Sequence, residues 1–161
     1  MNTHPEAWFS ALGTPLGEGE ADEIRAYLEG LGVEAALPAL LVGSWGQAET
    51  LTRGPVGGWW DTEEAERTRL ERLARVDPAD AEWLATTEML HGAAAIAAAR
   101  SGIADPGLIR AAAGAATYAA HQHRLARAAG MPPGHPFMRK YALFCGGRWP
   151  LGVYGDRFAI F

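Results

Sequence analysis

The chain has 161 residues, of which 48% are hydrophobic and 20% are charged, and its formal net charge is −5. This length suits a single domain whose core needs no disulfide, and the one cysteine, Cys145, excludes a disulfide framework or a multi-cysteine metal site. The first residues lack the basic and apolar regions of a secretory signal, and the longest apolar run, residues 89–99, is shorter than the roughly 20 residues of a membrane span. We therefore expect a soluble, cytoplasmic protein with no membrane partner.

The charges are divided unevenly along the chain. Residues 1–105 hold 18 of the 19 acidic residues and 7 of the 14 basic ones, whereas residues 106–161 hold Asp156 against seven bases. Such a division is typical of an anion-binding half, or of two halves that complement each other within the fold or across a dimer. We expect the second arrangement.

Residues 1–60 carry short apolar segments separated by glycines and prolines. The pattern predicts two helical turns over 5–12, a helix over 21–31 that begins with acidic residues, and a third short segment over 37–45. Residues 43–60 combine five glycines with three tryptophans, which indicates a loop whose indoles fold back onto the helices as a lid.

The next segment has the charge spacing of a solvent-exposed helix. Asp61 or Thr62 is placed to cap a helix that continues to about residue 76. Glu63–Arg67 and Glu71–Arg75 have the i,i+4 spacing of solvated ion pairs, and the apolar stripe is thin. This helix is expected on the surface.

Two Asp-Pro pairs introduce the longest helices. Asp77-Pro78 and Asp105-Pro106 each place a capping acid before a proline, and the helices they open run to about residues 100 and 129. Only residues 101–104 link them, so the helices must lie antiparallel as a hairpin. Both are rich in alanine, which favours close packing. With residues 61–76 they form a predicted three-helix core over 61–130.

The last segment, residues 131–161, changes character. His135-Pro136 begins a short helix that ends at Gly146-Gly147, and residues 151–161 have the alternation of a β-hairpin with a Gly155-Asp156 turn. This turn predicts Val153 opposite Phe158 and Leu151 opposite Ile160. Since two strands alone are marginally stable, they must pack on the helices or on a partner's strand. The expected fold is mainly α (α+β), with a central hairpin of two long Ala-rich helices.

Four polar residues fall at one height of the predicted hairpin. Glu88 and His91 share a helix face at i,i+3 spacing, and Tyr118 and His121 lie at the same level on the second helix. One interpretation is a hydrogen-bond network that serves stability. The alternative is a site in which Glu88, His91 and His121 bind a divalent metal such as zinc or iron, with Tyr118 behind them, or a metal-free acid–base pair.

Other chemical signatures are missing from the sequence. It has no phosphate-binding glycine loop, no dinucleotide fingerprint and no Gly-x-Ser-x-Gly motif. Basic and aromatic residues alternate near the C-terminus, as in surfaces that bind single-stranded nucleic acid, but the acidic balance of the chain argues against nucleic acid as a partner.

These observations lead to a functional hypothesis. We expect a small binding or adaptor domain that acts through association, either with a protein partner or with itself as a homodimer, and that requires no cofactor. The alternative hypothesis is a metal-dependent enzyme or metal-binding protein built on Glu88, His91 and His121.

Overall fold

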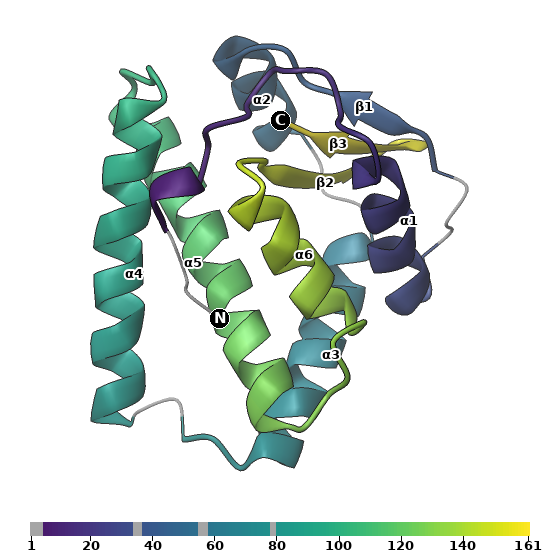
Figure 1. Ribbon diagram of the computed structural model, residues 1–161, viewed down its shortest axis with the longest axis vertical. Helices are drawn as coiled ribbons and strands as arrows, with labels where there is room; N and C mark the ends of the chain where they lie inside the picture. Colours follow the sequence, from purple (N-terminus) through teal and green to yellow (C-terminus); the bar gives the residue numbers. More distant parts are fainter. Residues whose placement is uncertain (1–4, 34–36, 55–57, 78–79) are drawn as a thin grey trace.

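The computed structural model describes residues 5–33, 37–54, 58–77 and 80–161, and over these residues the chain is mainly helical with one small sheet (Figure 1). In chain order the elements are the 3-10 turn η1 (Pro5–Ala7), α1 (Glu20–Gly30), β1 (Ala39–Leu41), α2 (Trp45–Thr52), α3 (Trp59–Ala74), α4 (Ala81–Arg100), α5 (Pro106–Ala128), α6 (Pro136–Cys145), β2 (Pro150–Tyr154) and β3 (Arg157–Ile160). These helices and strands confirm the predicted mainly α (α+β) class.

The long hairpin is formed by α4 and α5, which pack antiparallel at one edge of the molecule (Figure 1). Asp105 caps α5 by accepting a hydrogen bond from the Leu108 N–H at 2.8 Å, and Pro106 is the first helical residue, as predicted. The cap of α4 differs from the prediction. The helix begins at Ala81, and Asp80 rather than Asp77 accepts from the Trp83 N–H, at 3.0 Å. Pro78 lies outside the described residues.

The C-terminal hairpin belongs to a three-stranded sheet with the order β1–β3–β2. Val153 opposes Phe158 as predicted, but Ile160 opposes Pro150 rather than Leu151 because the register shifts between Pro150 and Gly152. The third strand, β1, pairs with β3 in parallel. Strand β1 of the same chain therefore pairs with the edge of the β2–β3 hairpin that would otherwise be open.

Two predictions for the first 60 residues are wrong. Of residues 5–12, only Pro5–Ala7 form a 3-10 turn, and Phe9, which follows it, has a positive φ of 64° and is buried in the core. The predicted loop over 43–60 contains α2, whose cap Ser44 accepts from the Gln47 N–H at 3.3 Å. It also contains the start of α3, which begins at Trp59 rather than after Asp61.

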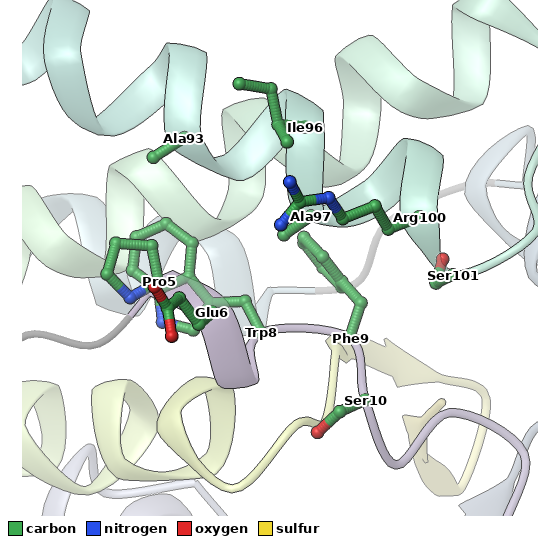
Figure 2. A pocket seen from close by; sticks show the side chains of 10 residues that line it. All are labelled: Pro5, Glu6, Trp8, Phe9, Ser10, Ala93, Ile96, Ala97, Arg100 and Ser101. Atoms are coloured by element: carbon green, nitrogen blue, oxygen red, sulfur yellow. The ribbon is translucent and has the colours of Figure 1, made fainter.

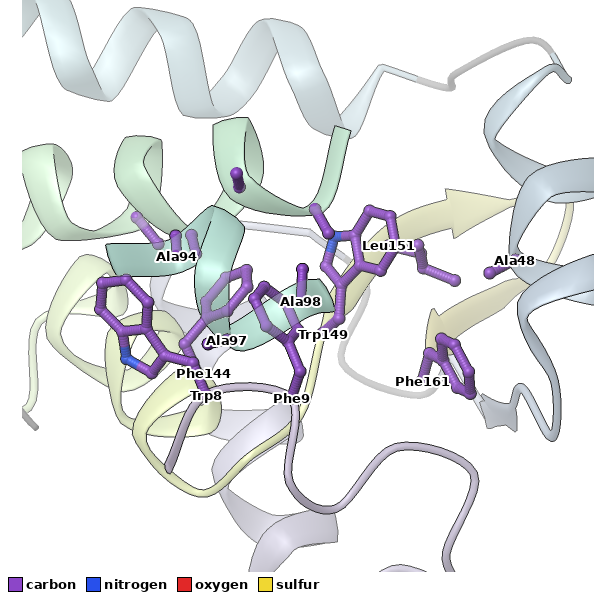
Figure 3. Packing of buried hydrophobic residues seen from close by; sticks show 14 of the residues in the cluster. Trp8, Phe9, Ala48, Ala94, Ala97, Ala98, Phe144, Trp149, Leu151 and Phe161 are labelled. Atoms are coloured by element: carbon purple, nitrogen blue, oxygen red, sulfur yellow. The ribbon is translucent and has the colours of Figure 1, made fainter. Parts of the chain in front are cut away.

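The alanine faces of α4 and α5 receive bulky side chains from elsewhere in the chain (Figure 3). Trp8 and Phe9 from the N-terminal segment, Phe144 from α6 and Trp149 before β2 pack against these alanines. Phe9 contacts Phe144 and Trp149 edge-on, with ring centroids 6.2 and 6.3 Å apart. Burial of these rings is the main apolar contribution to this half of the core.

The predicted tryptophan lid is formed only in part. Trp45 packs edge-on against Phe161 at 4.9 Å, and Trp59 is buried in a second core cluster with residues of α1, α3, α6 and β3. Trp60, by contrast, is 42% exposed. Its ring lies beside the polar residues described next.

Candidate functional site

Three of the four predicted site residues line one cavity of about 560 Å³ between α3, α4 and α5. His91, Tyr118 and His121 contribute to its wall, together with Trp60 and Arg67. Glu88 is exposed and is not among the lining residues. The hairpin thus brings the imidazoles and the phenol to one level, but the carboxylates at this cavity come from α3.

Glu64 takes the position beside the phenol that was predicted for Glu88. The Tyr118 hydroxyl donates a hydrogen bond to Glu64 Oε1. The Tyr118 ring stacks with Trp60, at a centroid distance of 5.5 Å, and with His121, at 6.5 Å. Tyr118 is therefore held both by its hydroxyl and by ring stacking.

His121 is held as a neutral imidazole. Its Nδ1 accepts a hydrogen bond from the Trp83 Nε1–H at 2.9 Å, which leaves the ring proton on Nε2, 3.9 Å from Glu71 Oε1. Burial lowers the pKa of His121, and the nearby Glu71 carboxylate only partly opposes this effect. A neutral ring with one nitrogen already hydrogen-bonded has limited capacity to act as a base.

His91 is less firmly held. It is exposed, and its Nδ1 lies 3.4 Å from the Thr117 hydroxyl, which donates to the Ala113 carbonyl at 2.7 Å.

The charged residues at this cavity are paired with one another. Arg67 supplies the positive charge beside the two carboxylates, with ion pairs to Glu64 at 3.0 Å and to Glu71. Within the described ranges, no three His, Cys, Asp or Glu side chains are grouped closely enough to hold a metal. The predicted ligands Glu88, His91 and His121 are included in those ranges. A zinc or iron site would need such a group of ligands at bonding distance.

A buried ionic network, which the sequence analysis does not predict, adjoins the cavity. Lys140 Nζ donates to both Glu63 carboxylate oxygens, at 2.8 and 2.7 Å, and to Gln122 Oε1 at 3.1 Å. Tyr27 donates to the same carboxylate, and desolvation raises the pKa of its phenol well above the usual value. Glu63 was predicted in a solvated pair with Arg67, but its exposed fraction is 0%. The i,i+4 spacing could not reveal that α1 and α6 cover this face of α3.

The basic residues of the C-terminal third face the acidic residues of the first two thirds. Arg148 pairs with Glu20 at 2.8 Å, and Arg139 pairs with Glu23 at 2.8 Å. His135 Nε2 lies 2.8 Å from Glu66 Oε1, and Lys140 pairs with Glu63 as described. These contacts occur within one chain, so much of the charge division is compensated by folding.

A different surface is apolar and uncovered. On the side of α4 opposite its contact with α5, five exposed residues follow one another at alternating spacings of four and three. We call them the α4 outer face: Ala85, Met89, Gly92, Ile96 and Ala99. Met89 is 66% exposed and Ile96 is 56% exposed, whereas Leu90, Ala94 and Ala98 on the opposite side are buried. Figure 1 shows α4 at the edge of the molecule.

Searches for similar proteins found no matching family model, no matching curated protein and no matching solved structure. Among the helices of the described residues, none combines the length and the apolar character needed to cross a membrane.

Proposed function

We propose that this protein acts through association, and that its partner on the α4 outer face is a second copy of the same chain. The observation that carries the proposal is the exposure of Met89 and Ile96 on a helix whose other side is buried. Large exposed apolar side chains that share one helix face mark an interaction surface.

The spacing of the α4 outer face supports a helix as the partner. Residues at alternating intervals of four and three form the seam of a helix pair, in which side chains of one helix enter the spaces of the other. Gly92, Ala85 and Ala99 are small, so two such helices can approach closely.

The pattern also supports a second copy rather than a different protein. Ala85 and Ala99 each lie seven residues from Gly92, while Met89 and Ile96 lie three and four residues from it. The face therefore presents nearly the same order of small and large residues in both chain directions. Such self-complementarity is what a two-fold symmetric interface requires.

Substitution of Gly92 tests the proposal without harm to the monomer. A Cβ at Gly92 would meet no atom within 4 Å, and replacing a helix-interior glycine by arginine favours the helix by about 0.5–1 kcal/mol. Light scattering over a range of concentrations should give a dimer mass for the wild type and a monomer mass for Gly92→Arg. Gly46→Arg is the matched control, because Gly46 is an exposed helical glycine of α2 with equally free space. A wild-type protein that stays monomeric at every concentration would contradict the proposal.

A further inference from the structure

A surface pocket lies directly beside the α4 outer face. It has a volume of about 430 Å³ and lies between the N-terminal segment around η1 and α4 (Figure 2). Trp8 and Phe9 form its wall on one side, while Ala93, Ile96 and Arg100 form the other. We call this the η1–α4 pocket. Ile96 belongs both to the pocket and to the α4 outer face, so the two features adjoin.

Met89 lies on the same row of α4 as the pocket residues. Met89, Ala93, Ile96 and Arg100 follow one another at spacings of four, three and four, so their side chains project along one side of the helix. Met89 lies before Gly92 and the other three lie after it. Met89, the most exposed large apolar side chain among the described residues, thus lies on the same strip of α4 as the pocket. Along the helix, Met89 and the pocket lie on opposite sides of Gly92.

Antiparallel pairing about Gly92 would bring these two features together. At a rise of 1.5 Å per residue, Met89 of a second copy would lie about 4.5 Å beyond the centre, level with the stretch from Ala93 to Ile96, which spans roughly 1.5 to 6 Å. A two-fold axis perpendicular to both helices keeps the row on the same side of the pair. Each Met89 would then face the η1–α4 pocket of the other copy.

We infer that the η1–α4 pocket binds the Met89 side chain of a second copy of this chain, reciprocally, in an antiparallel α4 pair. The inference rests on the proposed self-association and adds its orientation and its main contact. Methionine suits this role because its flexible, polarizable side chain fills irregular apolar spaces, and the indole and phenyl walls provide sulfur–aromatic contacts. Each copy has both a protruding Met89 and a pocket, so a single two-fold axis forms both Met89–pocket contacts.

The exposed charges of α4 favour the same orientation. Glu82 and Arg100 lie on one flank of the α4 outer face, ten residues before and eight residues after Gly92. In an antiparallel pair, Glu82 of one copy would lie within roughly 3 Å, along the axis, of the level of Arg100 of the other. In a parallel pair the two-fold axis would run along the helices and place this flank of the two copies on opposite sides, so Glu82 of one copy would not meet Arg100 of the other.

Disulfide trapping separates the two orientations. The background is Cys145→Ala, which removes the only native thiol. The variants Ala85→Cys and Ala99→Cys each add one thiol on the α4 outer face. If the pair is antiparallel, mild oxidation of a mixture should give a covalent dimer of the two variants, and neither variant alone should cross-link, because a disulfide needs Cα atoms within about 7 Å. Cross-linking of each variant with itself would overturn the inference while leaving the proposed self-association intact.

The affinity of the dimer tests the Met89 contact directly. Met89→Ala should raise the dissociation constant about tenfold or more, because it removes most of an apolar side chain buried in the partner's pocket. Met89→Leu should stay within a few-fold of the wild type. Leu73→Ala is the control, since Leu73 is 54% exposed but lies on α3. Sedimentation equilibrium gives these constants. An unchanged constant for Met89→Ala in a protein that still dimerises would overturn the pocket assignment, whereas a monomeric wild type would remove the proposed function as well.

Discussion

The Lys140 ammonium ties three helices together, because it lies on α6 and donates to Glu63 of α3 and to Gln122 of α5. Lys140 and Glu63 are buried together, so each side chain compensates the desolvation of the other. The exposed ion pairs of α3, such as Arg69–Glu66, contribute much less because water competes for the same groups.

Removal of Lys140 should therefore be far more costly than removal of a surface charge. Lys140→Met leaves the Glu63 carboxylate buried without its cation, and we expect a loss of about 3–5 kcal/mol in the free energy of unfolding. Urea denaturation measures this loss. The double variant Lys140→Met/Glu63→Gln should recover part of it, because the neutral amide no longer needs a counter-ion. A loss below about 1 kcal/mol for the single variant would show that the pair behaves like an exposed one.

The His121 imidazole makes stability depend on pH near neutrality. Burial lowers the pKa of His121, so below about pH 6.5 the unfolded chain takes up a proton before the folded one does. The contribution of this group is thus complete above pH 6.5 and is lost as the pH falls towards the folded pKa. His121→Gln should flatten the decline of unfolding free energy between about pH 7.5 and pH 5.5.

Glu20 provides the control for this pH series. Its hydrogen bond with Arg148 lowers the pKa of the carboxyl from 4.5, so its contribution is lost only in more acidic solution, as the pH falls through the folded pKa. Glu20→Gln should lower the stability at neutral pH but leave the slope between pH 7.5 and pH 5.5 unchanged. An equal slope in the wild type and in His121→Gln would contradict the assignment to His121.

At the scale of elements, some local signals were reliable, whereas others, such as the cap predicted at Asp77 for α4, were not. The α4–α5 hairpin could be predicted because its cap Asp105, its first residue Pro106 and its short link are adjacent in the sequence. The start of α2 also has a local signal in the sequence. Ser44 and Gln47 have the Ser-x-x-Gln spacing of a capping box, and the Gln47 side chain accepts from the Gly43 N–H at 2.8 Å. The glycines and tryptophans around this motif favour the prediction of a loop instead.

Contacts between segments that are far apart in the chain could not be predicted from the sequence. Strand β1 has only three residues, and it pairs with a strand more than a hundred residues later in the chain. Neither its length nor its residue pattern is therefore enough to predict a strand. The candidate site shows the same limit. Hairpin register predicts the height of His91, Tyr118 and His121, but not the rotation that exposes Glu88. The approach of Glu64 from α3 depends on packing between helices, which the register of one hairpin does not specify.

Strand β2 contains a glycine that its packing requires. Gly152 has φ +123°, and a Cβ at this position would lie 2.7 Å from the Trp59 ring. Gly102, in the α4–α5 link, has φ +92° but no atom within 4 Å of such a Cβ. Gly152→Ala should therefore lower the unfolding free energy by roughly 1–3 kcal/mol more than Gly102→Ala, because overpacking of the core adds to the backbone strain that both share. Chemical denaturation compares the two variants, and equal losses would mean that Trp59 moves aside freely.

At the scale of the whole molecule, ion pairs within the chain compensate part of its uneven charge. Arg148–Glu20, Arg139–Glu23 and Lys140–Glu63 each join the basic C-terminal third to the acidic part of the same chain. The charge division that could drive dimerisation is thus compensated in part by folding. Among the described residues, the α4 outer face carries the two most exposed large apolar side chains, Met89 and Ile96.

The salt dependence of dimerisation distinguishes these two driving forces. If the α4 outer face holds the copies together, raising the salt from about 0.05 to 0.5 M should change the dissociation constant less than about threefold, because salt screens exposed charges and does not weaken apolar burial. The Glu82–Arg100 contacts would account for the small weakening that remains. If acidic and basic regions of different copies paired instead, the same change should weaken the dimer about tenfold or more. Sedimentation equilibrium at the two salt concentrations measures the constant. Arg100→Gln should remove what salt dependence the wild type has, since its guanidinium would then no longer meet the partner's carboxylate.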